Sequence, residues 1–71
     1  MKKTLEHHYS NGQLEYRLNL LNGKRHGLCK WWYSNGQLNH RGNYLNDRRH
    51  GLHEEWWYNE ENWSREFHLT F

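Results

Sequence analysis

The sequence reads YSNGQL at residues 9–14 and YSNGQL again at residues 33–38, a spacing of 24 positions in a chain of 71. Asn-Gly flanked by apolar residues is a strong signal for a two-residue type I′ hairpin turn, because both central residues of that turn need positive φ. Each copy therefore predicts the tip of a β-hairpin. Repetition of the tip predicts hairpins that lie side by side.

A second pair of similar stretches has the same spacing. NGKRHGL at 22–28 is answered by NDRRHGL at 46–52. KWWYSNGQL at 30–38 is followed by EWWYNEENW at 55–63, which lies one position further along than the repeat requires. The extra position predicts an inserted residue near 53–55 and a β-bulge there.

These spacings predict an all-β fold, a single antiparallel meander of about six strands built from three hairpin repeats. The chain contains no Val, Ile, Ala or Pro, and its apolar residues are mainly Leu and twelve aromatics, which suit a pleated surface. We expect one domain over 1–71, with repeats at about 3–21, 22–45 and 46–71. The strands are expected near 3–9, 13–20, 27–33, 37–44, 51–58 and 62–70, with a looser third tip at NEEN, 59–62.

The turn positions also set the expected register, because side chains alternate between the two faces of a strand. The pairs expected on one, largely apolar face are Tyr9/Leu14, His7/Tyr16, Leu5/Leu18, Tyr33/Leu38, Trp31/His40 and Cys29/Gly42. The pairs expected on the other, polar face are Glu6/Arg17, His8/Glu15, Trp32/Asn39 and Lys30/Arg41.

The repeated residues resemble the MORN-repeat variant, a repeat of small bacterial and phage-borne proteins described as YwqK-like antitoxin components. YSNGQL, NGKRHGL and GNYLNDRRHGL carry the resemblance, which covers roughly residues 5 to 69. The resemblance implies a twisted ribbon of β-hairpins that is used mainly for interaction, with lipid contact in some members.

Motifs of catalysis are missing from the sequence, and we expect no enzyme, no catalytic residue and no cofactor. There is no nucleophile elbow and no Gly-rich phosphate loop. Cys29, the single cysteine, is expected to face the core opposite Gly42, a poor place for a nucleophile. His53 and His68 are expected to pair across the last hairpin, but two ligands are too few for a closed metal site, so we expect no metal.

Basic residues gather at one end of the strands of the expected meander. Successive turns lie at opposite ends of the strands, and six of the ten Lys and Arg fall at the end away from the YSNGQL tips. Successive clusters lie about 10 Å apart, at two strands per repeat. This spacing suits an acidic protein surface, a phosphodiester backbone or anionic headgroups, and it also suits turns that are charged only for solubility. The basic rim comprises Lys24, Arg25, His26, Arg48, Arg49 and His50, with Lys2 and Lys3 beside them.

The two Trp-Trp-Tyr stretches predict a second candidate site. Alternation assigns Trp31 and Trp56 to the core face and leaves Trp32 and Trp57 on the polar face. Two Trp in register beside basic side chains predict a binding strip, because Trp and Arg dominate interface hot spots. The alternative is a dimer that buries both faces of a thin sheet. The expected partner-binding residues are Trp32, Trp57, Arg17, Arg41 and Lys30.

Our first functional hypothesis is a non-enzymatic module that binds and neutralises a protein partner, as an antitoxin of a toxin–antitoxin pair or a phage inhibitor of bacterial defence does. The second is a nucleotide or nucleic-acid binder that uses exposed Trp and the basic rim. Free sheet edges near 3–9 and 62–70 favour a homodimer or higher oligomer. With no signal-peptide pattern and no apolar run of about 18 residues, we expect a cytoplasmic chain without transmembrane insertion.

Overall fold

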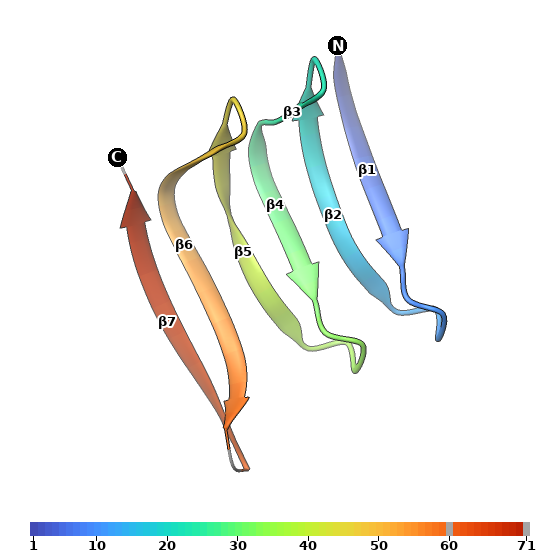
Figure 1. The fold of residues 1–71 in the computed structure, drawn as a ribbon, viewed down its shortest axis with the longest axis vertical. Coiled ribbons are helices and arrows are strands. Elements are labelled where there is room, and N and C mark those ends of the chain that lie inside the picture. Colours follow the sequence, from blue (N-terminus) through green and yellow to red (C-terminus); the bar gives the residue numbers. More distant parts are fainter. Residues whose placement is uncertain (60, 71) are drawn as a thin grey trace.

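The computed structural model describes residues 1–59 and 61–70, and its elements are strands of one antiparallel sheet. Strands that follow one another in the chain lie side by side, in the order β1-β2-β4-β5-β6-β7, with β3 paired to β2 (Figure 1). The all-β antiparallel meander is therefore confirmed. No helix in the described part of the chain is long and apolar enough to cross a membrane. The strands are β1 Lys2–His8, β2 Leu14–Leu21, β3 Lys24–Arg25, β4 Gly27–Trp32, β5 Leu38–Leu45, β6 Arg48–Asn59 and β7 Asn62–Thr70.

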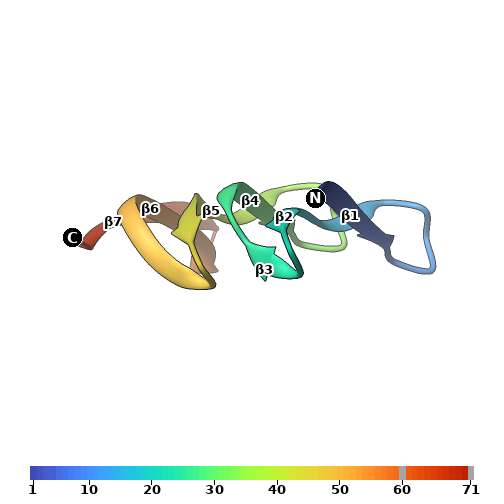
Figure 2. The ribbon, with the colours of Figure 1, turned by 90° about the horizontal axis from the view of Figure 1, so that it is seen from above.

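The sheet is a single layer. Its principal extents are 42 × 32 × 10 Å, and the view in Figure 2 shows no second layer over either face of the described residues. Side chains on a face are therefore covered only by neighbours on the same face. The histidine face carries Cys29, Trp31, His40, Tyr44 and His53, and the arginine face carries Arg17, Lys30, Arg41, Glu54 and Phe67.

The small core of the protein lies on the histidine face. Cys29 and His53 are 0% exposed, and His40 and Tyr44 are buried beside them. Gly42 pairs with Cys29 on one side and with His53 on the other. A Cβ at Gly42 would lie 2.1 Å from His53 Nδ1, so only glycine leaves room for the imidazole ring. The predicted pairing of Cys29 with Gly42, facing the core, is confirmed.

The YSNGQL tips form a different turn from the predicted type I′. In the first tip, Gly12 has positive φ (90°) and Asn11 does not. The Gly12 N–H donates to Tyr9 O at 3.0 Å, and the Tyr9 N–H donates to Gln13 O at 2.8 Å. A four-residue turn closed by a glycine in the left-handed region is a three-residue loop with a G1 bulge. The second tip repeats this geometry around Gly36, whose φ is 89°.

The bulge changes the register near each tip and leaves the rest of the hairpin as predicted. His8 lies opposite Leu14 and Trp32 opposite Leu38, because one strand contributes an extra residue there. The pairs that this makes wrong are Tyr9/Leu14, His8/Glu15, Tyr33/Leu38 and Trp32/Asn39. The confirmed pairs are Leu5/Leu18, Glu6/Arg17, His7/Tyr16, Cys29/Gly42, Lys30/Arg41 and Trp31/His40. In the third hairpin Asn59 pairs with Asn62, and the predicted looser tip includes Glu60, which lies outside the described residues.

Type I′ turns occur at the opposite end of the strands from the YSNGQL tips. Asn22 and Gly23 have φ of 52° and 83°, and Asn46 and Asp47 have φ of 51° and 69°. Two consecutive residues with positive φ between paired strands define this turn. At 11–12 and 35–36 the Asn-Gly signal therefore predicted the hairpins correctly and their turn type wrongly, whereas Asn22-Gly23 does form a type I′ turn.

The irregularity predicted near residues 53–55 lies earlier in β6 and is shared by two repeats. The β5–β6 register shifts beside Gly51, which has positive φ, and the β2 pairing shifts in the same way beside Gly27. No residue is inserted near His53, because the spacing of 24 continues beyond it. Two equivalent hydrogen bonds show this spacing: the Tyr9 hydroxyl donates to Trp32 O, and the Tyr33 hydroxyl donates to Trp56 O, both at 2.6 Å.

Candidate binding face

Trp32 and Trp57 do not share a face, so the predicted pair is wrong. Trp32 lies on the arginine face, where the Arg17 guanidinium carbon is 6.0 Å from its ring centroid. Its counterpart is Trp56, whose ring centroid is 5.6 Å from the Arg41 guanidinium carbon. Strand alternation then places Trp57 on the histidine face. The two WWY stretches are 25 residues apart in the sequence, whereas the strands repeat every 24, so the second Trp of one copy corresponds to the first Trp of the other.

The three predicted cationic residues do lie together. Arg17 pairs across the sheet with Lys30, and Lys30 pairs with Arg41, so three cations occupy neighbouring positions on three strands. Arg17 Nε donates to Glu6 Oε2 at 2.5 Å, and Arg41 Nε donates to Glu54 Oε1 at 2.9 Å. Among the described residues, the Lys30 ammonium has no carboxylate partner.

Arg65, which sequence reasoning missed, extends this arrangement onto β7. Its guanidinium carbon lies 4.6 Å from the ring centroid of Phe67 and 5.9 Å from that of Trp56. Its Nη1 is 3.8 Å from Glu54 Oε2. The buried Glu54 carboxylate therefore lies between Arg41 and Arg65, and both cations cover Trp56. The signal that was available is the spacing of Arg17, Arg41 and Arg65 at 24 residues.

The larger feature that sequence reasoning missed is an apolar surface on the same arginine face. Phe67 is 51% exposed, Tyr58 58% and Leu69 61%. Cross-strand pairing places Leu52 beside Leu69 and Tyr58 beside Trp63. Of the ten large apolar side chains that are exposed in the described structure, seven belong to this face by strand alternation. We call them the apolar patch: Leu28, Leu45, Leu52, Tyr58, Trp63, Phe67 and Leu69.

A hollow of about 520 Å³ lies at the tip end of the strands, beside Tyr58 and Trp63 of the apolar patch. Its lining includes Tyr33, Trp57, Tyr58 and Trp63, with polar atoms from the second tip. The ring centroid of Trp63 is 5.7 Å from that of Tyr33 and 5.3 Å from that of Tyr58. Trp57 therefore contributes to an aromatic hollow, although it is not part of the strip with Trp32.

Internal contacts occupy part of the basic rim. The Arg25 guanidinium lies 3.2 Å from Asp47 Oδ1 and 4.4 Å from the centroid of the Tyr44 ring. The backbone N–H and the guanidinium of Arg25 hold the pKa of Asp47 below its usual value. Arg49 contacts Glu55 at 3.3 Å. Two cations of the rim thus stabilise the fold, and Lys24, Arg48, His26 and His50 remain as its other members.

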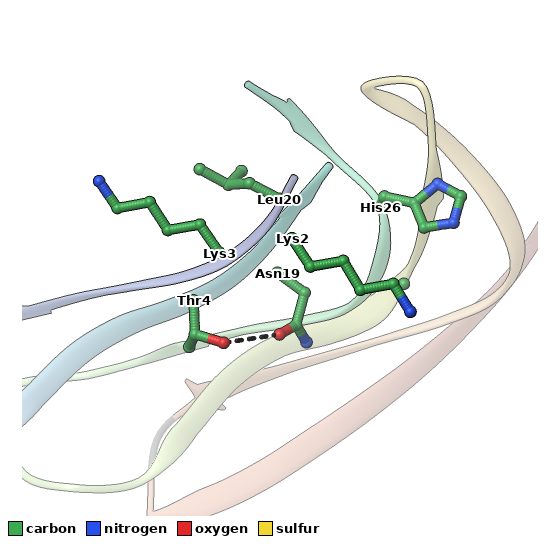
Figure 3. Close-up of a pocket in the computed structure, with 7 residues that line it drawn as sticks. Lys2, Lys3, Thr4, Asn19, Leu20 and His26 are labelled. Carbon is green, nitrogen blue, oxygen red and sulfur yellow. Dashed lines mark hydrogen bonds between the residues drawn. The ribbon is translucent and has the colours of Figure 1, made fainter. Parts of the chain in front are cut away.

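Lys2 and Lys3 border a shallow depression of about 360 Å³ at the end of the strands that carries the basic rim (Figure 3). Thr4 Oγ1 donates to Asn19 Oδ1 at 3.2 Å on its floor. Figure 3 shows Lys3 extending away from His26, so the basic groups do not converge on one point. His26 Nδ1 is buried without a hydrogen-bond partner among the described residues.

The buried histidines form a hydrogen-bonded chain and leave no free nitrogen on His53. His40 Nε2 lies 3.1 Å from His53 Nδ1, and His53 Nε2 lies 2.7 Å from Asn43 O. Glu55 Oε1 is 3.5 Å from His40 Nδ1. His68 pairs with His53 across the sheet, as predicted. Within residues 1–59 and 61–70, no three His, Cys, Asp or Glu side chains are placed to hold a metal ion.

Burial raises the pKa of the Cys29 thiol above its usual value, which suppresses the reactive thiolate. Its Sγ faces the carbonyl oxygens of Asn19 at 3.9 Å and Gly27 at 3.8 Å. Cys29 therefore acts as a small packing residue in the core.

Comparison of the chain with family models, with curated proteins and with solved structures gave no match.

Proposed function

We propose that this chain is a non-enzymatic protein-interaction module that binds its partner through the arginine face. The observation that carries the proposal is the apolar patch on one face of a single-layer sheet, next to the Arg17–Lys30–Arg41 row. Exposed apolar side chains gathered on one face of a small protein are typical of interaction sites. Aromatic and Arg side chains are also the residues that contribute most binding energy at protein interfaces.

The chemistry of the face defines the partner. An apolar surface complements the patch, most of which lies on β6 and β7, and acidic side chains beside it complement the cation row on β2, β4 and β5. The aromatic hollow lined by Tyr33, Trp57 and Trp63 fits one large apolar side chain of the partner. The resemblance of YSNGQL and NGKRHGL to the MORN-repeat variant supports a neutralising role, as a small antitoxin or as a phage-type inhibitor of a bacterial defence protein.

The test compares the two faces of β7. Phe67→Ser/Leu69→Ser removes apolar side chains from the arginine face, and the matched control Glu66→Ser/His68→Ser changes the histidine face of the same strand. Both variants and the wild type are tagged and used to capture proteins from bacterial lysate, with quantitative mass spectrometry. We expect a specific protein that the wild type and control retain and the Phe67/Leu69 variant loses by tenfold or more. Equal capture by all three chains would contradict the proposal.

A nucleotide or nucleic-acid binder is the second candidate, and the cation row beside Trp32 is the observation that favours it. Bases stack on Trp, and cations neutralise phosphates, with affinity that falls steeply as salt rises. Titration of a labelled single-stranded oligonucleotide at two salt concentrations tests it. Tight, salt-sensitive binding that Lys30→Ala weakens, with no capture of a protein partner, would favour this candidate over the first.

A further inference from the structure

The internal repeat defines how one repeat pairs with the next. β2 pairs with β4 through Tyr16 opposite Trp31, and β5 pairs with β6 through His40 opposite Glu55. Both members of the second pair lie 24 residues beyond those of the first. The second strand of each repeat therefore presents the same edge, in the same register, to the first strand of the repeat that follows.

The two outer strands of the sheet carry the two halves of this contact. β7 lies 24 residues beyond β5, and β1 lies 24 residues before β4. In the described sheet each of them pairs on one side only. All seven residues of β1 are exposed. Unpaired N–H and C=O groups along such an edge form a template for another strand.

We infer that β7 of one copy pairs antiparallel with β1 of a second copy, in the register that continues the repeat. In the third hairpin Glu66 lies opposite Glu55, as His40 lies opposite Trp31 in the second hairpin, so Glu66 takes the place of His40. Continuing the His40/Glu55 register therefore places Glu66 opposite His7 of the second copy. The neighbouring pairs are then Phe67 with Glu6 and His68 with Leu5, and Arg65 lies diagonal to Glu6. The partner is thus another molecule of this chain, attached through the opposite edge.

Charge complementarity supports this register. Inside the chain Arg65 lies diagonal to Glu54, with its Nη1 3.8 Å from Glu54 Oε2. Because Glu6 takes the place of Glu54 in the first repeat, Arg65 would lie in the same diagonal relation to Glu6 of the second copy. On the histidine face, Glu66 would lie opposite His7 of the second copy. Opposite charges on facing strands stabilise a sheet, and like charges destabilise it.

The contact uses a different edge on each copy, so it is heterologous. Heterologous contacts build a ring where the rotation between subunits closes and an open chain where it does not. The sheet is a flat layer with extents of 42 × 32 × 10 Å, so we expect an open chain. One internal contact is missing between copies: Trp57 is the counterpart of Tyr9 and Tyr33, whose hydroxyls donate to the next repeat. We therefore expect the contact between copies to be weaker than the contacts between repeats, with assembly that depends on concentration.

A charge swap tests the inference. Glu6→Arg and Arg65→Glu are prepared singly and together, and average mass is measured by sedimentation against concentration. The wild type should grow beyond a dimer at high micromolar concentration, and each single variant should associate at least about tenfold more weakly. An equimolar mixture of the single variants, and the double variant, should recover association, because each restores an Arg–Glu pair. Arg48→Glu, which makes the same charge change on an interior strand, should associate like the wild type.

A second measurement does not depend on charge. A Leu5→Cys/His68→Cys chain should form a ladder of disulfide-linked oligomers under mild oxidation, because these two positions face each other between copies. A Leu5→Cys/Phe67→Cys chain should not, because its cysteines point to opposite faces. A monomeric wild type, a mass that stops at the dimer, or a mixture of single variants without recovery would each overturn the inference.

Discussion

His53 lies directly over Gly42, and its ring occupies the space that a side chain at that position would fill. Gly42→Ala is therefore expected to lower the free energy of unfolding by about 1–3 kcal/mol, the usual cost of overpacking a core. Urea unfolding measures this loss. In a His53→Ala background the same substitution should cost much less, because the ring is gone. Equal losses in both backgrounds would show that the contact does not constrain residue 42.

The buried histidines predict that stability falls in acid. Burial is the largest of the effects that lower the pKa of His40 and of His53 below 6.5. The Arg49 cation lowers both pKa values further, and the Glu55 carboxylate raises them. The unfolded chain then binds more protons than the folded one below about pH 6.5, so the free energy of unfolding rises with pH through that window and levels off above it.

Urea unfolding between about pH 5 and pH 7.5 checks this prediction. His40→Gln removes one of the two buried groups and should reduce the pH dependence. The exposed His50→Gln serves as the control and should keep the wild-type slope. A free energy of unfolding that is constant over this range, or that rises as pH falls, would contradict the assignment.

Two asparagines with different backbone conformations predict opposite responses to glycine. Asn46 has a φ of 51°, whereas Asn35 has no positive φ. Asn46→Gly should be nearly neutral, because glycine adopts positive φ without strain, while Asn35→Gly should cost about 0.5–1 kcal/mol. The Asn35→Gly substitution also removes the hydrogen bond that the Gln37 N–H donates to Asn35 Oδ1. If Asn35→Gly were neutral as well, the tip would be a type I′ turn after all. Urea midpoints of the two variants decide this.

The correspondence of Trp32 with Trp56 predicts which tryptophan matters for folding. Trp56 packs between the guanidinium groups of Arg41 and Arg65, whereas Trp57 is more exposed. Trp56→Ala should lower the free energy of unfolding by about 2 kcal/mol, through lost burial and cation–π contacts. Trp57→Ala should cost less than half as much. Thermal and urea unfolding of both variants measure the difference, and the reverse order would contradict the alignment.

Much of the fold could be predicted from the sequence, because the 24-residue repeat and period-two alternation act locally along each strand. Pairs away from the tips, such as Leu5/Leu18 and Cys29/Gly42, followed directly. The tip pairs could not, since Asn-Gly fits both a type I′ turn and a three-residue loop. At the tips the loop is reinforced by contacts between repeats, such as Tyr9 with Trp32 O.

The candidate site was predicted in part. Arg17, Lys30 and Arg41 form the predicted row, because their register depends on strand positions well away from the turns. The position of Trp57 was wrong, because matching identical letters gave a spacing of 25 where the backbone keeps 24. The apolar patch was missed for the same reason. Once β6 is assigned the correct face, Leu52, Tyr58, Phe67 and Leu69 fall on one surface.

Hydroxyl-radical footprinting of the complex tests whether the arginine face binds the partner. The captured partner is bound to the wild-type chain, and side-chain oxidation is compared by mass spectrometry with that of the chain alone. We expect strong protection of Tyr58, Trp63 and Phe67, with Leu5 on the histidine face unchanged. Protection of Leu5 while Tyr58, Trp63 and Phe67 stay fully reactive would contradict it.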